Sequence, residues 1–246
     1  MTATTVTAGA GPNNDPKHAA RATRTAGREM RSRLLDAASR LFKERGLSGT
    51  SIAAIAAAAD AFPSQITYYF RTKEALFVEA ACRDVLYVAR TAEQVAQRAW
   101  TSQDYSLALV ESVMRADGVG FFVQAMTLTR RRQDLAPLVE RTIERLHSEG
   151  LRAHLAAMQA HGWRSIQESA VIARRFWTLA VGVTLEGHAM GRSTDRLISD
   201  LLELLEPEVD AGDGKGKCPH RLRLAAGETP VAESPHPGRS KAETKP

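Results

Sequence analysis

The chain has 246 residues, 43% of them hydrophobic and 25% charged, with a formal net charge of +5. This length and composition are typical of a globular protein with one large domain or two small ones. No apolar run approaches the roughly 20 residues that span a bilayer, the N-terminus lacks the order of a signal peptide, and two cysteines do not make a disulfide framework. We therefore expect a cytoplasmic protein without a membrane partner, whose mild positive charge permits an anionic partner without identifying it.

Residues 1–26 are rich in Thr, Ala, Gly, Pro and Asn, and we predict that they form a disordered arm. They offer too few large apolar groups to offset the entropy lost on ordering. The stretch from Lys17 to Arg33 holds six basic residues and a single acid, Glu29. A solvated tail is the simplest interpretation of such a run, unless a segment that binds nucleic acid follows it.

An amphipathic helix is predicted from Arg31 to Arg45, because apolar residues recur on one face and charged residues on the other. Gly46 is typical of the position just beyond a helix C-terminus. After a loop at 47–49, either Thr50 or Ser51 can cap the next helix. The apolar face consists of Leu34, Ala37, Ala38, Leu41 and Phe42.

Residues 50–70 are predicted to form two short helices joined by a tight corner. The first has an apolar face of Ile52, Ile55, Ala56 and Ala59. In the second, Ile66 and Phe70 point inward, while hydroxyl, amide and phenol side chains face outward. This arrangement is a helix-turn-helix, so residues 27–72 are predicted to be a three-helix DNA-binding domain. The basic arm before it then adds affinity for phosphate through counterion release.

The rest of the chain is predicted to be a larger helical domain, residues 73–207, followed by a disordered tail at 208–246. Helices are expected at 73–99, 103–116, 118–131, 135–161 and 165–190, the last capped by Ser165, with a final helix from Ser193 that is rich in leucine. No strand pattern and no internal repeat stand out. The predicted fold class is all-α.

The helix-turn-helix segment resembles that of the TetR/AcrR family of bacterial transcriptional regulators. The preceding LLDAASRLFKERG is similar to the first helix of that family. The matching positions are Thr50-Ser51-Ile52, Ile55-Ala56, Ala59, Ile66, Tyr68-Tyr69-Phe70, Lys73 and Leu76.

The resemblance implies which residues contact DNA. Thr50 or Ser51 would contact phosphate, as would Tyr69 and Lys73, while the recognition helix would lie over the major groove. Gln65 is the best base reader, because its amide can pair bidentately with adenine, and Thr67 can touch a thymine methyl. Tyr68 either contacts DNA or packs between helices. The groove-facing set is Pro63, Ser64, Gln65 and Thr67.

Four positions depart from the family pattern. Asp60 replaces the glycine of the turn, and Asp tolerates a left-handed backbone better than most residues. Phe62 replaces a capping serine, which leaves Ser64 as the alternative cap, with Pro63 suited to the first helical position. Thr67 and Tyr69 replace a tyrosine and a histidine. These changes leave the scaffold intact and alter the surface that reads DNA.

The resemblance also implies a dimer built by the helices at 165–190 and 193–206, because one recognition helix covers too few base pairs for specificity. The leucine-rich last helix supports this interpretation, and burial within one subunit is the alternative. The expected interface residues are Ile172, Leu179, Val183, Leu197, Leu201 and Leu205.

A ligand pocket is expected in the second domain, lined by large or polarizable side chains, although each of them can equally be ordinary core. Glu111, Glu186 and His188 are candidates to orient a polar or cationic ligand, and Trp100, Tyr105 and Trp163 either join them or lie in loops. The predicted pocket set is Met114, Phe121, Phe122, Met126, Met158, Phe176 and Trp177.

The function predicted from the sequence is a dimeric repressor that binds a palindromic operator and is released by a small apolar or aromatic effector. A regulator without an effector and a non-specific architectural DNA-binding protein are the alternatives. No catalytic constellation, cofactor or metal site is predicted: His154 and His161 share a helix face without a carboxylate and are expected to lie on the surface.

Overall fold

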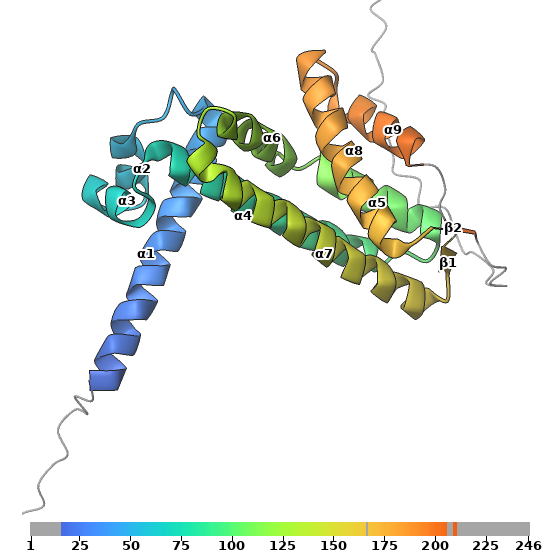
Figure 1. The fold of residues 1–246 in the computed structure, drawn as a ribbon, viewed down its shortest axis with the longest axis horizontal. Coiled ribbons are helices and arrows are strands. Elements are labelled where there is room, and N and C mark those ends of the chain that lie inside the picture. Colours follow the sequence, from blue (N-terminus) through green and yellow to red (C-terminus); the bar gives the residue numbers. More distant parts are fainter. Residues whose placement is uncertain (1–15, 166, 206–208, 211–246) are drawn as a thin grey trace, which may run out of the picture. The chain divides into compact units, whose positions relative to one another are not determined.

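The computed structural model describes residues 16–165, 167–205 and 209–210, all within one structural unit, residues 1–212 (Figure 1). The expectations for residues 1–15 and 211–246 lie outside the described part. The described chain consists of helices apart from one pair of two-residue strands, which confirms the all-α prediction. None of the helices in these residues is long and apolar enough to cross a membrane.

The first helix, α1, runs from Pro16 to Arg45 and begins well before the predicted Arg31. The expectation of disorder is therefore wrong for residues 16–26. This segment is rich in alanine and arginine, which favour helix, and extending a helix that is already anchored needs no new nucleus. The predicted apolar face is correct, because Leu34 and Phe42 are both fully buried.

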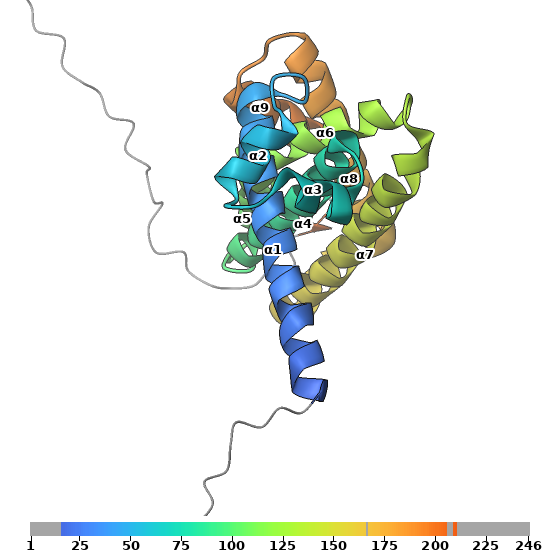
Figure 2. The same ribbon diagram turned by 90° about the vertical axis from the view of Figure 1, so that its left-hand side faces the viewer.

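Two short helices follow, α2 (Ile52–Ala58) and α3 (Pro63–Phe70), and pack against each other and against neighbouring helices. With α1 they form the N-terminal helix-turn-helix domain (Figure 2). Ile55 and Ile66 fill its centre and are completely buried. The sequence pattern therefore placed both inward-facing isoleucines correctly.

The second domain begins with α4 (Lys73–Ala96), which packs against α1, α5, α6 and α7 and so lies at the centre of the fold. Most of one side of α4 is buried, including Leu76, Val78 and Val85. The remaining elements are α5 (Ser102–Met114), α6 (Gly118–Thr129), the 3-10 turn η1 (Gln133–Leu135), α7 (Ala136–His161), α8 (Ser169–Ala189) and α9 (Thr194–Leu204).

A short antiparallel pair joins β1 (Arg164–Ser165) to β2 (Val209–Asp210). The pairing corrects two expectations, since Ser165 does not cap α8 and residues 209–210 are ordered beside β1. Glu168 occupies the N-terminal cap position of α8 instead. The pair is too short to carry a detectable strand pattern in the sequence.

The two domains meet at an aromatic cluster made by Phe42 of α1, Phe77 of α4 and Phe121 of α6. The Phe77 ring lies 5.0 Å from each of the other two ring centroids, in edge-to-face geometry. Ion pairs surround the cluster: Arg31 binds Glu79, and Lys43 Nζ lies 3.0 Å from Asp84 Oδ2. The helix-turn-helix domain is thus attached to α4 by both apolar and charged contacts.

Candidate DNA-binding surface and interior cavity

The corner between α2 and α3 is held by three local features. Ser51 caps α2, with its Oγ accepting a hydrogen bond from the Ala54 N–H at 3.0 Å. Asp60 adopts a φ of 50°, so the left-handed backbone that the sequence required of it is confirmed. The Ala61 N–H donates to the Ala56 carbonyl at 2.9 Å and closes the turn.

Gln65 caps the recognition helix α3, and Ser64 does not. The Phe62 N–H donates to Gln65 Oε1 at 2.9 Å, while the Gln65 N–H donates to the Phe62 carbonyl, also at 2.9 Å. Pro63 occupies the first helical position, where its missing N–H costs nothing. The expected bidentate contact between Gln65 and adenine uses the same oxygen, Oε1, and stays a prediction.

The outer surface of α3 is formed by side chains that no other part of the described chain covers. Tyr68 is 80% exposed, so the alternative that it packs between helices is wrong. Phe62 is 75% exposed, and Pro63, Ser64 and Thr67 are exposed as well. Because large apolar side chains are seldom this exposed together, the surface has the character of a contact site.

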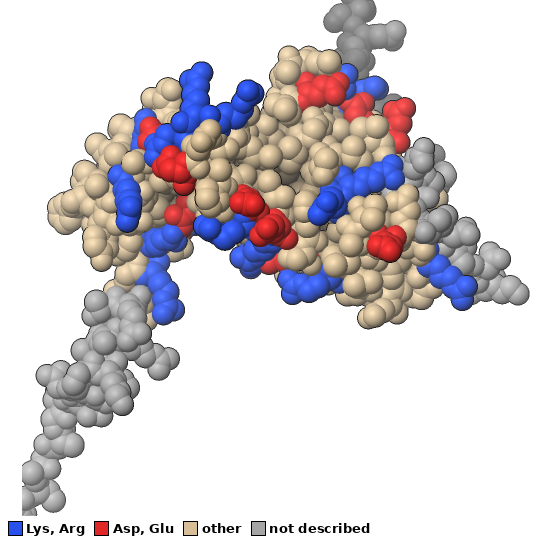
Figure 3. Space-filling view, in the orientation of Figure 1, with Lys and Arg blue, Asp and Glu red and all other residues tan. Residues whose placement is uncertain are grey.

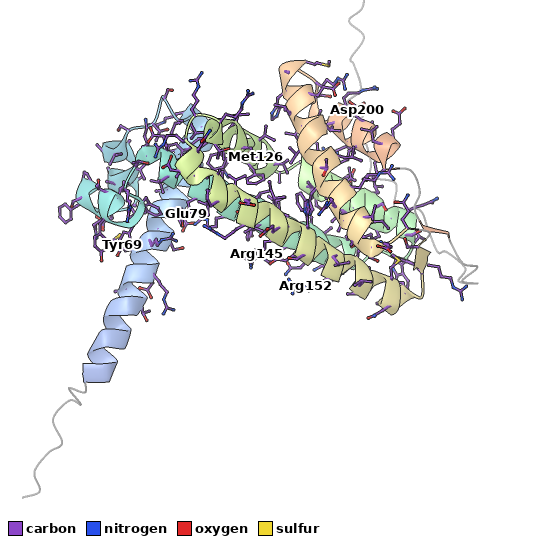
Figure 4. The ribbon with its side chains drawn as sticks, viewed as in Figure 1. Tyr69, Glu79, Met126, Arg145, Arg152 and Asp200 are labelled. Carbon is purple, nitrogen blue, oxygen red and sulfur yellow. The ribbon has the colours of Figure 1, made fainter. Side chains whose placement is uncertain are left out.

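Tyr69 lies differently from its neighbour. It is half-buried against the core, its ring meets that of Tyr68 edge to face at 5.0 Å, and it points toward α1 (Figure 4). Its hydroxyl lies beside Gly27 of α1, at 3.4 Å from the position a Cβ would occupy there. A phosphate contact by Tyr69 stays a prediction.

Thr50 and Lys73 have structural roles that the sequence did not indicate. Thr50 is only 1% exposed, and its Oγ1 lies 2.8 Å from the Gly46 carbonyl. Its hydroxyl is buried in the loop, so of the two expected phosphate contacts, Thr50 or Ser51, the exposed Ser51 stays the prediction. Lys73 Nζ donates to the carbonyls of Leu47 (2.8 Å) and Thr50 (2.9 Å), and so ties this loop to the start of α4.

Arg71 is a cation that sequence reasoning missed. It is exposed at the C-terminal end of α3, with a φ of 65°, and within the described residues it makes no ion pair within 4.0 Å. On the face drawn in Figure 3, the outer surface of α2 and α3 is mostly uncharged, with basic side chains nearby. A cation at this edge is suited to a phosphate group. The sequence signal that could have identified Arg71 is its position at the start of RTKEAL, directly after the recognition helix.

A cavity of about 80 Å³ lies inside the second domain. Side chains of α4, α5, α7 and α8 line it, together with Trp163 and Leu205, and it is partly open to the surface. The lining consists of Ala89, Glu93, Ser102, Tyr105, Ser106, Leu109, Gly150, Ala153, His154, Met158, Trp163, Ile172, Ala173, Phe176, Trp177 and Leu205.

Three ionisable groups line this mostly apolar cavity. Burial, reinforced by the charge of Glu149, raises the pKa of Glu93 to about 7. Burial also raises the pKa of Tyr105 to about 12, with a smaller contribution from Glu93, and lowers the pKa of His154. His154 is 7% exposed, so the expectation that it lies on the surface is wrong.

Only part of the predicted pocket set lines the cavity. Met158, Phe176 and Trp177 do so. Phe121 belongs to the aromatic cluster between the domains, Phe122 is fully buried in the core, and Met114 and Met126 pack in or against the core. Met114 and Phe121 instead line a separate pocket of about 290 Å³.

The polar candidates for the pocket divide in the same way. Glu111 and Glu186 are engaged at the surface, by Arg115 at 3.7 Å and Arg192 at 3.6 Å, and His188 lies against Gly120 of α6. None of them lines the cavity. Tyr105 and Trp163 do line it, whereas Trp100 is exposed.

The predicted interface residues turn inward rather than outward. Leu197 and Leu201 are buried, and Leu197 packs so closely on Gly187 of α8 that a Cβ there would lie 2.0 Å from it. Val183 is also buried, Leu179 packs against the core, and Ile172 and Leu205 line the cavity. The exposed large apolar residues here are Val171 and Leu185 of α8, Met190 at its C-terminal cap, and Leu204 of α9. Sequence periodicity selected the inner face of both helices, and whether α8 and α9 form a dimer interface stays a prediction.

Within the described residues, no group of His, Cys, Asp and Glu side chains is arranged to hold a metal ion.

Known protein families match most of the described chain. The family "Bacterial regulatory proteins, tetR family" matches residues 34–80, and the family "Bacterial transcriptional repressor C-terminal" matches residues 102–206. A comparison with curated proteins found no match.

Several solved structures of transcriptional regulators are similar to this chain. A proposed transcriptional regulator from Rhodococcus sp. RHA1 is 36% identical, with a TM-score of 0.65 over 72% of this chain and 96% of that chain. A TetR-family regulator proposed for Mesorhizobium loti is 19% identical (TM-score 0.57, covering 73% of this chain and 94% of that one). A regulator from Saccharomonospora viridis, solved in complex with choline, is 21% identical (TM-score 0.55, covering 73% and 96%).

Proposed function

The chain belongs to the TetR family of bacterial transcriptional regulators, which are DNA-binding proteins and not enzymes, and we propose that it is a ligand-responsive repressor that binds a palindromic operator as a dimer. The observation that carries this proposal is the exposed outer surface of α3, on which Tyr68 is 80% exposed beside Thr67 and Ser64. These side chains face the major groove, and Arg71 at the end of the helix contacts phosphate.

One recognition helix contacts too few base pairs to specify an operator, so two are needed, about one helical turn apart. The protein therefore acts as a dimer. The exposed apolar residues of α8 and α9 supply the contact. Leu185 and Val171 lie on the outer side of α8, and Gly182 between them has no neighbour within 4 Å of a Cβ position. A glycine at the centre of such a face lets a second helix approach closely.

Replacing Leu185 with aspartate is expected to convert the dimer to a monomer at micromolar concentration, because a charge would be buried without a partner at the interface. Sedimentation velocity measures this directly. Val95→Asp is the matched control, since Val95 has a similar exposure on α4, outside α8 and α9. A dimer that persists in Leu185→Asp would show that the interface lies elsewhere.

Ligand response is supported by the position of the cavity along α4. Glu93 lies near one end of this helix, and Lys73, at its other end, holds the loop of the helix-turn-helix domain. The cavity is smaller than the 300–1,000 Å³ typical of ligand pockets, so a ligand has to spread the surrounding helices. Displacement of α4 would move the reading surface and release DNA. The choline complex concerns a protein that shares only the fold, so the ligand has to be argued from this cavity.

Selection of bound DNA from a random pool tests the proposed function. We expect enrichment of an inverted repeat whose half-sites are separated by about one helical turn. Enrichment of a single half-site would contradict the dimeric arrangement. Binding that depends on salt but selects no sequence would instead indicate an architectural DNA-binding protein.

A further inference from the structure

The cavity in the second domain contains a carboxyl group that is not directly paired with a described side chain, although the charges of Arg90 and Arg152 act on it. Glu93 lines it from α4, and among the described residues it makes no ion pair within 4.0 Å. A second carboxylate, Glu149 of α7, carries an oxygen, Oε2, that is buried and has no hydrogen-bond partner in the described structure. Its other oxygen lies 2.6 Å from Arg145 Nε. An unpaired carboxyl group in an apolar site is costly unless a cation joins it.

Aromatic rings form much of the remaining wall. Phe176 and Trp177 meet edge to face at 5.3 Å, and Tyr105 and Trp163 at 6.0 Å. The faces of such rings attract cations, tryptophan most strongly. The indole nitrogen of Trp177 lies beside Gly150 of α7, at 3.4 Å from the position of a Cβ there.

A second, independent feature of the cavity is a buried imidazole atom without a hydrogen-bond partner among the described residues. His154 lines the cavity, is 7% exposed, and has an Nδ1 atom without a hydrogen-bond partner among the described residues. Burial lowers the pKa of this imidazole, so it is neutral near pH 7 and does not repel a positive charge. Buried polar atoms are nearly always paired, so a bound molecule with a polar group is the natural partner.

We propose that the cavity binds a monovalent organic cation with an apolar body, an ammonium compound whose charge lies at Glu93 and whose apolar part lies between Tyr105 and Trp177. This inference rests on the proposed ligand response and names the chemical class of the ligand. It narrows the expected small apolar or aromatic effector to a charged one, because the aromatic walls are combined with a carboxyl group that makes no ion pair with a described residue.

The proposal implies a pH dependence of binding. The groups around Glu93 are Arg90 on its own helix, Tyr105 on α5, and Glu149, Arg152 and His154 on α7; Figure 4 shows Arg145 and Arg152 along α7. Burial and Glu149 raise the pKa of Glu93 to about 7 against the opposing effect of the arginines. A cation favours the ionised carboxylate, so its affinity is expected to rise with pH by up to about tenfold per unit below pH 7 and to level off above it.

The test compares two probes of nearly equal shape, 2-phenylpropan-2-ammonium, whose N–H groups can donate to His154, and its neutral isostere tert-butylbenzene, by isothermal titration calorimetry on the full chain. We expect the cation to bind the wild type at least about tenfold more tightly than the isostere. Glu93→Gln, which keeps the shape and removes the charge, should lose that preference and the pH dependence. Glu140→Gln, an exposed position on α7, is the matched control and should bind as the wild type does.

Each outcome decides the proposal. Equal binding of the two probes, an unchanged cation affinity in Glu93→Gln, or no binding of the cation would overturn it. Circular dichroism melting of each variant confirms that it is folded, so a loss of binding is not mistaken for unfolding. Release of operator DNA is measured in parallel. It distinguishes a failure of the cation proposal from a failure of the proposed repressor function. Cation binding without release would contradict the ligand-responsive repressor alone, whereas release by the neutral probe alone would contradict the cation.

Discussion

Replacing Phe121 with alanine is expected to lower the free energy of unfolding by about 3–5 kcal/mol, the range for a buried aromatic residue. Phe121 is 3% exposed, and its ring packs edge to face on Phe77. Phe77 in turn contacts Phe42 of α1. Removing the Phe121 ring would therefore leave an empty space where the two domains meet. Urea unfolding followed by circular dichroism measures the change, and we expect both domains to lose stability in a single transition.

Phe62→Ala is the matched control, because the same atoms are removed from a side chain that is mostly exposed. We expect it to change the unfolding free energy by less than about 0.5 kcal/mol. If Phe121→Ala destabilised only the second domain, and the helix-turn-helix domain melted separately at its original midpoint, the aromatic cluster would not couple the domains.

The helix-turn-helix domain was predictable where a single residue decides the local geometry. Ser51 as a cap, Gly46 and Asp60 at positive φ, and Ile66 facing inward all follow from local chemistry. The roles of Thr50 and Lys73 were not predictable in this way. Their partners are backbone carbonyls of a loop, and a carbonyl has no signature in the sequence.

The cavity was less predictable than the helices around it. Met158 and Phe176 were predictable as large side chains suited to a pocket. Glu93 and His154, which also line the cavity, have the sequence pattern of ordinary surface residues on amphipathic helices. Only the packing of α4, α5, α7 and α8 brings them to one space. The same limit applies to α9, where leucine periodicity indicates an apolar face without telling whether it meets its own subunit, as Leu201 does.

Replacing Lys73 with methionine is expected to lower the free energy of unfolding by about 2 kcal/mol and to weaken binding to every DNA sequence alike. The ammonium group is half-buried and donates to two carbonyls, at 2.8 and 2.9 Å, and a hydrogen bond from a charged group contributes roughly 1.5–3 kcal/mol before its exposure is considered. Methionine keeps most of the apolar stem, so the change reports on the hydrogen bonds. The loop between α1 and α2 would no longer be hydrogen-bonded to α4, so the outer surface of α3 would no longer be held in position.

Lys43→Met is the matched control for this prediction, because Lys43 makes a single ion pair with Asp84 near the surface and such pairs contribute less than about 1 kcal/mol. Urea unfolding gives the stability, and fluorescence anisotropy with operator and scrambled duplexes gives the affinities. A residue that acts only through phosphate would weaken both duplexes while leaving stability unchanged. A loss of stability together with equal losses of affinity is therefore the result that assigns Lys73 to positioning the domain, with its third N–H left for phosphate.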